Sequence, residues 1–254
     1  MGQKLVRFES VESSGVRRLL SNSAAAILNS CISYLQRMVP RRCLLCDAPT
    51  TRGWVCAGCD PELPRLPCAR CAVCAVPLAW GSTCGACLRH PPAFERVTTA
   101  FAYTFPVDAM ICALKYGRRL ALAPVLGAVF AEEVAPQADV LVPMPLAPRR
   151  HAERGFNQAL ELARSLSLRH RVPIAARACR KVMETPPQAA LPWKERARNV
   201  RRAFVCDTSF DGLRVAVVDD VLTTGATMNE LARVLRKAGA IGVSGCVLAR
   251  TLPR

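Results

Sequence analysis

The sequence predicts an α/β fold in which a parallel sheet flanked by helices follows a small Cys-rich region. Its 254 residues are 51% hydrophobic and only 6% aromatic, enough for one α/β domain and a smaller module. From residue 93 onward, apolar runs of strand length alternate with helical patterns, which is typical of a parallel sheet. Most of the fourteen cysteines precede that point. We therefore expect three regions, at 1–42, 43–92 and 93–254.

The first region is a basic leader. Residues 1–42 hold seven Lys and Arg against two Glu, and apolar side chains recur at helical spacing over 23–38. The helix docks either on the same chain or on a partner, and the basic arm is either solvated or in contact with nucleic acid. No run of 18 apolar residues and no signal peptide are found, so we expect a cytoplasmic protein without a transmembrane segment.

The cysteines of the second region form a repeat. Two copies of Cys-x-x-Cys, nine residues, Cys-x-x-Cys lie in register 28 residues apart. Zinc prefers four thiolates in a tetrahedron, and four thiolates leave no open position for water, so we predict two structural zinc ions. The ligands are Cys43, Cys46, Cys56, Cys59, Cys71, Cys74, Cys84 and Cys87. The pairing is open: sites form within each copy or between copies, and Cys68 offers an alternative knuckle.

The third region shows the alternation of the α/β class. Strands are expected at 97–105, 140–144, 203–206, 213–218 and 241–249. Helices are expected at 107–116, 120–134, 157–168 and 228–238. Residues 174–202 lack periodicity and contain three prolines, so we expect a loop there.

A candidate phosphate-binding loop follows the buried run at 213–218. It consists of Asp219, Asp220, Val221, Leu222, Thr223, Thr224, Gly225, Ala226 and Thr227, and a helix follows. Free amides at a helix N-terminus, threonine hydroxyls and a glycine form a cradle for phosphate. The adjacent carboxylates are suited to accept hydrogen bonds from ribose hydroxyls. The Gly-x-x-x-x-Gly-Lys-Ser/Thr motif is absent, which excludes a P-loop as the source of this pattern.

This loop resembles the phosphoribosyl pyrophosphate (PRPP) signature of type I phosphoribosyltransferases. The resemblance implies that fold, with Asp219 and Asp220 on the ribose hydroxyls and residues 223–227 on the 5′-phosphate. Residues 142–158 resemble the pyrophosphate loop, in which Arg149 and Arg154 would neutralise the leaving pyrophosphate and its magnesium. Residues 185–201 resemble the mobile lid of this class. The residues implied in catalysis are thus Asp219, Asp220, Arg149 and Arg154.

The combination of these segments resembles the ComF family of competence proteins. It includes the double zinc ribbon, the motif Leu114–Tyr116 and the loops just described, over roughly residues 40 to 250. The resemblance implies a role in natural transformation, in which single-stranded DNA enters the cytoplasm. Met183 stands where many relatives carry an arginine, which puts one lid contact in doubt.

A basic stretch within the third region supports a polyanionic partner. Residues 149–202 hold fourteen Lys and Arg against four Asp and Glu, more than a phosphosugar pocket needs. Phe156 and Trp193 are candidate stacking surfaces for single-stranded DNA. The expected DNA-binding residues are Arg149, Arg150, Arg154, Lys194, Arg196, Arg198, Arg201 and Arg202.

Two other functions stay open. One is an active phosphoribosyltransferase in nucleotide or base salvage, using magnesium and PRPP, although no residue stands out as recognising an acceptor. The other is a zinc-ribbon module that docks a DNA-uptake helicase. Whether the protein is an enzyme is therefore undecided by the sequence.

Overall fold

The computed structural model describes residues 41–50, 54–117, 119–183 and 203–252. These residues form two compact units, 41–63 and 64–252. The expected helix at 23–38 and the expected lid at 185–201 lie outside the described residues. In the smaller unit, β1 (Arg41–Arg42) pairs antiparallel with β2 (Pro49–Thr50), and a single 3-10 turn, η1, spans Asp60–Glu62.

The larger unit is built on a four-stranded parallel sheet. Its order is β3 (Val97–Ala102), β8 (Gly242–Arg250), β7 (Arg214–Leu222) and β4 (Val140–Pro143). The central strands are buried on both sides: residues 215–218 of β7 are all Val or Ala, and residues 245–249 of β8 are small or apolar. An isolated bridge between Leu141 and Ile174 extends the pairing beyond β4.

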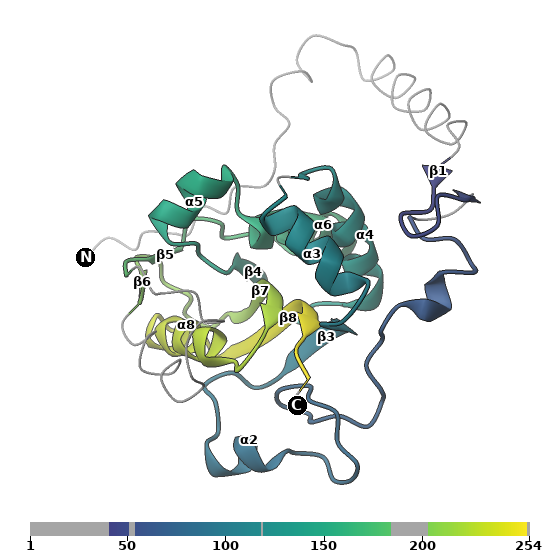
Figure 1. The fold of residues 1–254 in the computed structure, drawn as a ribbon. Helices are drawn as coiled ribbons and strands as arrows, with labels where there is room; N and C mark the ends of the chain where they lie inside the picture. The colour runs from purple at the N-terminus through teal and green to yellow at the C-terminus, as the bar shows by residue number, and fades with distance from the viewer. Residues whose placement is uncertain (1–40, 51–53, 118, 184–202, 253–254) are drawn as a thin grey trace, which may run out of the picture. The chain divides into compact units, whose positions relative to one another are not determined.

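Helices cover both faces of this sheet (Figure 1). One face carries α3 (Val107–Lys115), α4 (Leu122–Glu133) and α6 (Gln158–His170), and the other carries α8 (Ala226–Lys237). Phe130 and Leu162 are fully buried in the first layer, and Leu231 and Leu235 in the second. The α/β class predicted from the sequence is confirmed.

Shorter elements lie around this framework. They are α2 (Gly85–Arg89), α5 (Pro148–Arg154), β5 (Cys179–Lys181) and β6 (Phe204–Cys206). The expectation of a loop throughout 174–202 was wrong at β5, which pairs antiparallel with β6. The expected end of β7 at Val218 was also wrong, because the ladder with β8 continues through the acidic pair to Leu222.

Contact between α4 and α6 depends on a glycine. A Cβ added at Gly127 would lie 2.1 Å from the Ser165 Oγ, closer than any real contact. We expect Gly127→Ala to lower the free energy of unfolding by about 1–3 kcal/mol, because the two helices must separate. Adding Ser165→Gly removes the obstructing side chain and should restore most of the loss. Urea unfolding measures both effects, and a Gly127→Ala protein as stable as the wild type would contradict this packing.

Candidate functional site: a carboxyl-edge cavity and two cysteine clusters

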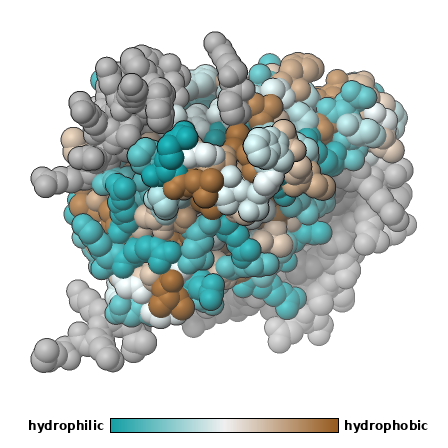
Figure 2. Space-filling model, turned by 90° about the horizontal axis from the view of Figure 1, so that it is seen from below, coloured by the Kyte–Doolittle hydropathy of each residue, from teal (hydrophilic) through white to brown (hydrophobic). Residues whose placement is uncertain are grey.

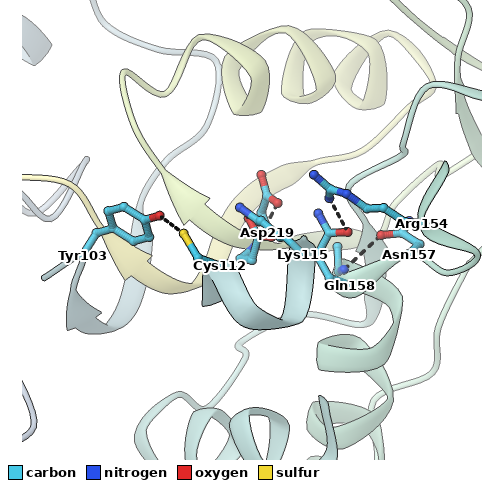
Figure 3. Close-up of polar contacts among 9 residues, drawn as sticks. Tyr103, Cys112, Lys115, Arg154, Asn157, Gln158 and Asp219 are labelled. Atoms are coloured by element: carbon cyan, nitrogen blue, oxygen red, sulfur yellow. Dashed lines mark hydrogen bonds and ion pairs between the residues drawn. The ribbon is translucent and has the colours of Figure 1, made fainter. Parts of the chain in front are cut away.

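A cavity of about 280 Å³ opens at the carboxyl ends of β4 and β7, where parallel α/β sheets bind ligands. Side chains from four separate segments meet there. Its charged lining residues are Lys115, Arg150, Arg154, Lys181, Asp219 and Asp220. In Figure 3, Lys115 and Asp219 lie between the end of α3 and the end of β7, with Arg154 and Gln158 to one side.

The acidic pair projects from the last part of the β7 ladder. Asp220 is the more buried, with only 6% of its side chain exposed, and its Oδ1 lies 2.9 Å from the Lys115 Nζ. Its other oxygen, Oδ2, is buried and has no hydrogen-bond partner among the described residues. A buried carboxylate oxygen without a donor is costly. The site therefore suits a ligand that brings a hydroxyl donor to this oxygen.

Asp219 sits in an environment that disfavours its charge. Burial and the neighbouring Asp220 carboxylate raise the pKa of Asp219 to about 7, although the Lys115 ammonium opposes this. Asp219 Oδ1 accepts a hydrogen bond from the Asp220 amide at 2.9 Å. In the absence of ligand, the carboxyl group of Asp219 thus titrates near neutral pH.

This raised pKa predicts a pH dependence of stability. The folded protein holds a proton on Asp219 that the unfolded chain, with an ordinary carboxyl pKa near 4, releases. The stabilising contribution is complete below the unfolded pKa and is lost as pH rises through about 7. Asp219→Asn lacks this loss, so its stability relative to wild type should rise between pH 5 and pH 8. Urea unfolding at both pH values measures the difference, and a constant difference would contradict the assignment.

Within the candidate phosphate-binding loop, residues 219–222 belong to β7 and α8 begins at Ala226, so only residues 223–225 lie between these elements. We call residues 223–225 the phosphate loop. Gly225 has a φ of +80°, which favours glycine. Of the residues predicted to bind PRPP, Asp219, Asp220, Val221, Thr223 and Thr227 line the cavity. Leu222 is part of the apolar core. Thr224, Gly225 and Ala226 instead line a second cavity on the other side of the loop.

The predicted arginines lie on α5, which the sequence analysis did not predict as a helix. Arg150 and Arg154 line the cavity, whereas Arg149 is exposed and paired with Glu153 at 2.9 Å. The Arg154 guanidinium lies 5.3 Å from the centre of the Tyr116 ring, a cation–π contact. The other predicted DNA-binding residues, Lys194, Arg196, Arg198, Arg201 and Arg202, lie outside the described residues.

The α5–α6 connection is fixed to the sheet by Asn157. Its side chain accepts the Ala159 amide at 3.0 Å, capping α6, and donates to the Met144 carbonyl at 3.1 Å. Gly155 ends α5 in the left-handed conformation. The arginines are thus held beside the carboxyl end of β4. Phe156, proposed as a stacking surface, is half-buried, and Trp193 lies outside the described residues.

Sequence reasoning gave no role to two side chains of the candidate site and missed a third. Lys115 belongs to a motif noted in the sequence, but only the fold shows its ion pair with Asp220. Tyr116, from the same motif, supplies an exposed aromatic ring beside Arg154. Lys181 gave no sequence signal. Burial and the Arg150 charge lower the pKa of Lys181, and the Asp219 carboxylate opposes this effect.

The eight predicted metal ligands form two clusters, each within one copy of the repeat. In both clusters the four Sγ atoms lie within 4.8 Å of one another. The copies share their geometry: the amide of Cys56 donates to the Cys43 Sγ, and that of Cys84 to the Cys71 Sγ, both at 3.3 Å. The interleaved pairing is therefore wrong, and Cys68 is exposed and outside both clusters. Four thiolates at this spacing fit a tetrahedral zinc ion.

The clusters predict the metal content of two matched variants. Wild type should hold two zinc ions per chain, and Cys59→Ser and its counterpart Cys87→Ser should each lose one, because each cluster is self-contained. Mass spectrometry of dialysed protein measures the zinc directly. If either single substitution emptied both sites, the two clusters would not be independent.

Comparison with known proteins adds the family. A family model described as the double zinc ribbon domain matches residues 34–88. DNA utilization protein YhgH of Salmonella typhi is 34% identical over 226 residues, covering 84% of this chain and 99% of the relative. Competence protein F of Haemophilus influenzae is 30% identical over 177 residues, covering 65% and 77% of the two chains.

Two solved structures show a distant likeness. The allosteric regulatory enzyme of purine biosynthesis covers 49% of this chain and 25% of its own, with 24% identity and a TM-score of 0.34. A purine phosphoribosyltransferase from Pyrococcus horikoshii covers 61% and 87%, with 16% identity and a TM-score of 0.27.

The predicted architecture is confirmed: a parallel sheet flanked by helices follows a Cys-rich ribbon region with two zinc-binding sites of four cysteines each. Among the described residues, no helix is both long and apolar enough to cross a membrane. With relatives aligned over most of its length, the chain belongs to the ComF family of competence and DNA utilization proteins.

Proposed function

We propose that this protein binds PRPP or a related phosphosugar at the carboxyl-edge cavity and handles incoming single-stranded DNA in the cytoplasm. One observation carries the first part. An acidic pair, one of whose buried oxygens has no described partner, shares a cavity with Thr223, Thr227 and cationic side chains. A diol matches the acidic pair, a phosphate matches the two threonines, and a pyrophosphate matches the cationic side chains.

The acidic pair and the cationic side chains orient the ligand in the cavity. Its ribose hydroxyls donate to Asp219 and Asp220, and its 5′-phosphate accepts from Thr223, Thr227 and the amides at the start of α8. Arg150, Arg154 and Lys181 then face the pyrophosphate. Magnesium would enter with that pyrophosphate, and its chemistry would be to neutralise the charge of the phosphate oxygens.

DNA handling is supported by the rim of the cavity and by the relatives. Tyr116 is 73% exposed and lies under the Arg154 guanidinium, with exposed Arg149 on the same helix as Arg154. Single-strand binding proteins combine cationic grooves with aromatic rings on which bases stack. The two relatives described above are named for DNA utilization and competence.

The DNA proposal is tested by a salt series. A fluorescent single strand should bind the full chain at low salt, with affinity falling steeply as salt rises, because phosphate contacts release counterions. The same titration with magnesium PRPP present shows whether the two ligands compete for the arginines. No binding at low salt, or binding that does not depend on salt, would contradict DNA handling but would not affect the phosphosugar proposal.

Catalysis is a second candidate. Arg150, Arg154 and Lys181 lie in the same cavity as the acidic pair, an arrangement suited to stabilising pyrophosphate as it leaves the anomeric carbon. A panel of bases and amines, assayed for pyrophosphate release from PRPP, tests this activity. If no acceptor gives release above that of an Asp219→Asn/Asp220→Asn protein, the phosphosugar is a bound ligand rather than a substrate.

Docking of a DNA-uptake helicase on the zinc ribbon rests on two exposed apolar side chains. Trp80 and Leu88, on the second ribbon, are 87% and 67% exposed. Figure 2 shows the molecule from below, with apolar residues in small areas separated by hydrophilic ones. Such small areas do not by themselves mark an interface, so we rank docking below phosphosugar and DNA binding.

A further inference from the structure

A buried arginine joins the second cysteine cluster to the phosphate loop. Arg250, the last residue of β8, is only 9% exposed. Its Nε donates to the carbonyl of Cys74 at 3.0 Å, and Cys74 is one of the four thiolates of the second cluster. Its Nη1 donates to the carbonyls of Leu222, at 3.1 Å, and Thr223. One guanidinium thus holds a metal ligand and the first peptides of the loop together.

The acceptors around Arg250 are all neutral groups, and they are not equivalent. The described hydrogen-bond partners of Arg250 are backbone carbonyls and the Thr251 hydroxyl, with no carboxylate among them. Nη1 has two hydrogens and four described acceptors, whereas the Nε–H has a single described acceptor, the Cys74 carbonyl. Displacement of Cys74 therefore leaves a buried donor of the guanidinium unpaired, which is costly. Movement of Cys74 is therefore transmitted to Leu222 and Thr223.

The loop amides are oriented by the same contacts. In a trans peptide the N–H points opposite to the carbonyl of the same peptide unit. Because Arg250 holds the carbonyls of Leu222 and Thr223, the following N–H groups point away from Arg250. Arg250 is thus a positioning residue for a loop that, on the proposed function, binds phosphate through its amides and hydroxyls.

Few other contacts support the loop from the ribbon side. A cavity of about 410 Å³ separates Cys84 and Cys87 from Thr224 and Gly225. Beside Arg250, the described support comes from the Ala93 amide, which donates to the Asn229 Oδ1 at 2.6 Å, and from the Phe94 ring against Gly225. The Val73 carbonyl also accepts the Val97 amide at 2.8 Å, which fixes the ribbon to β3, and Arg250 adds a direct hydrogen-bonded connection from the ribbon to the loop.

We propose that zinc at the second ribbon and phosphosugar at the loop are energetically coupled through Arg250. Zinc fixes the position of Cys74, Arg250 fixes the loop carbonyls, and the loop then holds the phosphate. Coupling between two ligands is reciprocal in their binding free energies, so bound phosphosugar must also raise the affinity of this cluster for zinc. We expect the tighter site to release its zinc more slowly. The first cluster lies in the other compact unit and serves as an internal control. This inference rests on the proposed function.

The test follows zinc release from the full chain to a chromogenic chelator, with and without ribose 5-phosphate. Wild type should release its two zinc ions in two phases. The phase that is absent from Cys87→Ser belongs to the second cluster and should slow about fivefold or more with the sugar phosphate. The phase that is absent from Cys59→Ser belongs to the first cluster and should not change. Arg250→Lys retains every zinc ligand and a positive charge, but it loses the forked geometry. It should abolish the protection and weaken ribose 5-phosphate binding by a similar factor.

The outcomes separate the two proposals. If wild type binds neither ribose 5-phosphate nor magnesium PRPP, the proposed function fails and the coupling fails with it. If wild type binds ribose 5-phosphate but both zinc phases respond equally, or if Arg250→Lys behaves as wild type, the coupling alone is overturned. The two zinc-release phases are compared in the wild-type protein. The coupling is therefore tested even if the Arg250→Lys protein folds poorly.

Discussion

Asp219→Asn/Asp220→Asn is expected to lower PRPP affinity by about two orders of magnitude or more. Two hydrogen bonds to charged groups contribute about 1.5–3 kcal/mol each, and every 1.4 kcal/mol is a factor of about ten in affinity. The Asp220 oxygen without a described partner makes this carboxylate the stronger of the two determinants. Calorimetric titration with magnesium PRPP measures the loss.

The control must separate binding from folding. Asn at 220 leaves the Lys115 ammonium without its carboxylate, so a further variant adds Lys115→Gln to restore the charge balance. Asp207→Asn/Asp211→Asn removes two exposed carboxylates of the same unit and should keep wild-type affinity. Retention of affinity by the Asp219→Asn/Asp220→Asn protein would show that the acidic pair does not hold the ligand.

Arg149→Gln/Arg150→Gln/Arg154→Gln is expected to produce the second large effect, on binding of single-stranded DNA. Each lost phosphate contact makes the negative slope of log affinity against log salt shallower by about 0.7, so the loss of three contacts makes it shallower by about 2. Affinity at low salt should also fall, because the same phosphate contacts are lost. Fluorescence anisotropy over a series of salt concentrations measures slope and affinity together.

A charge-matched control makes this result specific. Arg164→Gln/Arg169→Gln/Arg233→Gln removes the same net charge from exposed positions on α6 and α8 that do not line the cavity. If both triple variants lose the same affinity, the effect comes from net charge alone and the rim of the cavity has no special role.

The sequence predicted those features that depend on local pattern. Apolar segments of strand length placed the four strands of the sheet, and the Cys-x-x-Cys repeat placed both metal clusters. The repeat even extends to the backbone, since Asp47 and Ala75, at equivalent positions, both have positive φ. The alternatives for ligand pairing needed the structure, because spacing alone does not say which knuckles meet.

The features that the sequence did not predict depend on tertiary contact or on weak local signals. Pro148 and Gly155 mark the ends of α5, but the helix is short and buries no residue, so it has no apolar stripe. The extension of β7 through two aspartates depends on pairing with β8. Lys181 and Arg250 reach the site from distant segments, and no spacing in the sequence links them to the phosphate loop.

The most direct test of the central claim is a calorimetric titration of the wild-type chain with magnesium PRPP, with ribose 5-phosphate and with magnesium pyrophosphate. Because the cavity places the acidic pair and phosphate loop opposite the cations, PRPP should bind at one site per chain, more tightly than either half. Absence of saturable PRPP binding, or PRPP binding no tighter than pyrophosphate alone, would contradict a phosphosugar site.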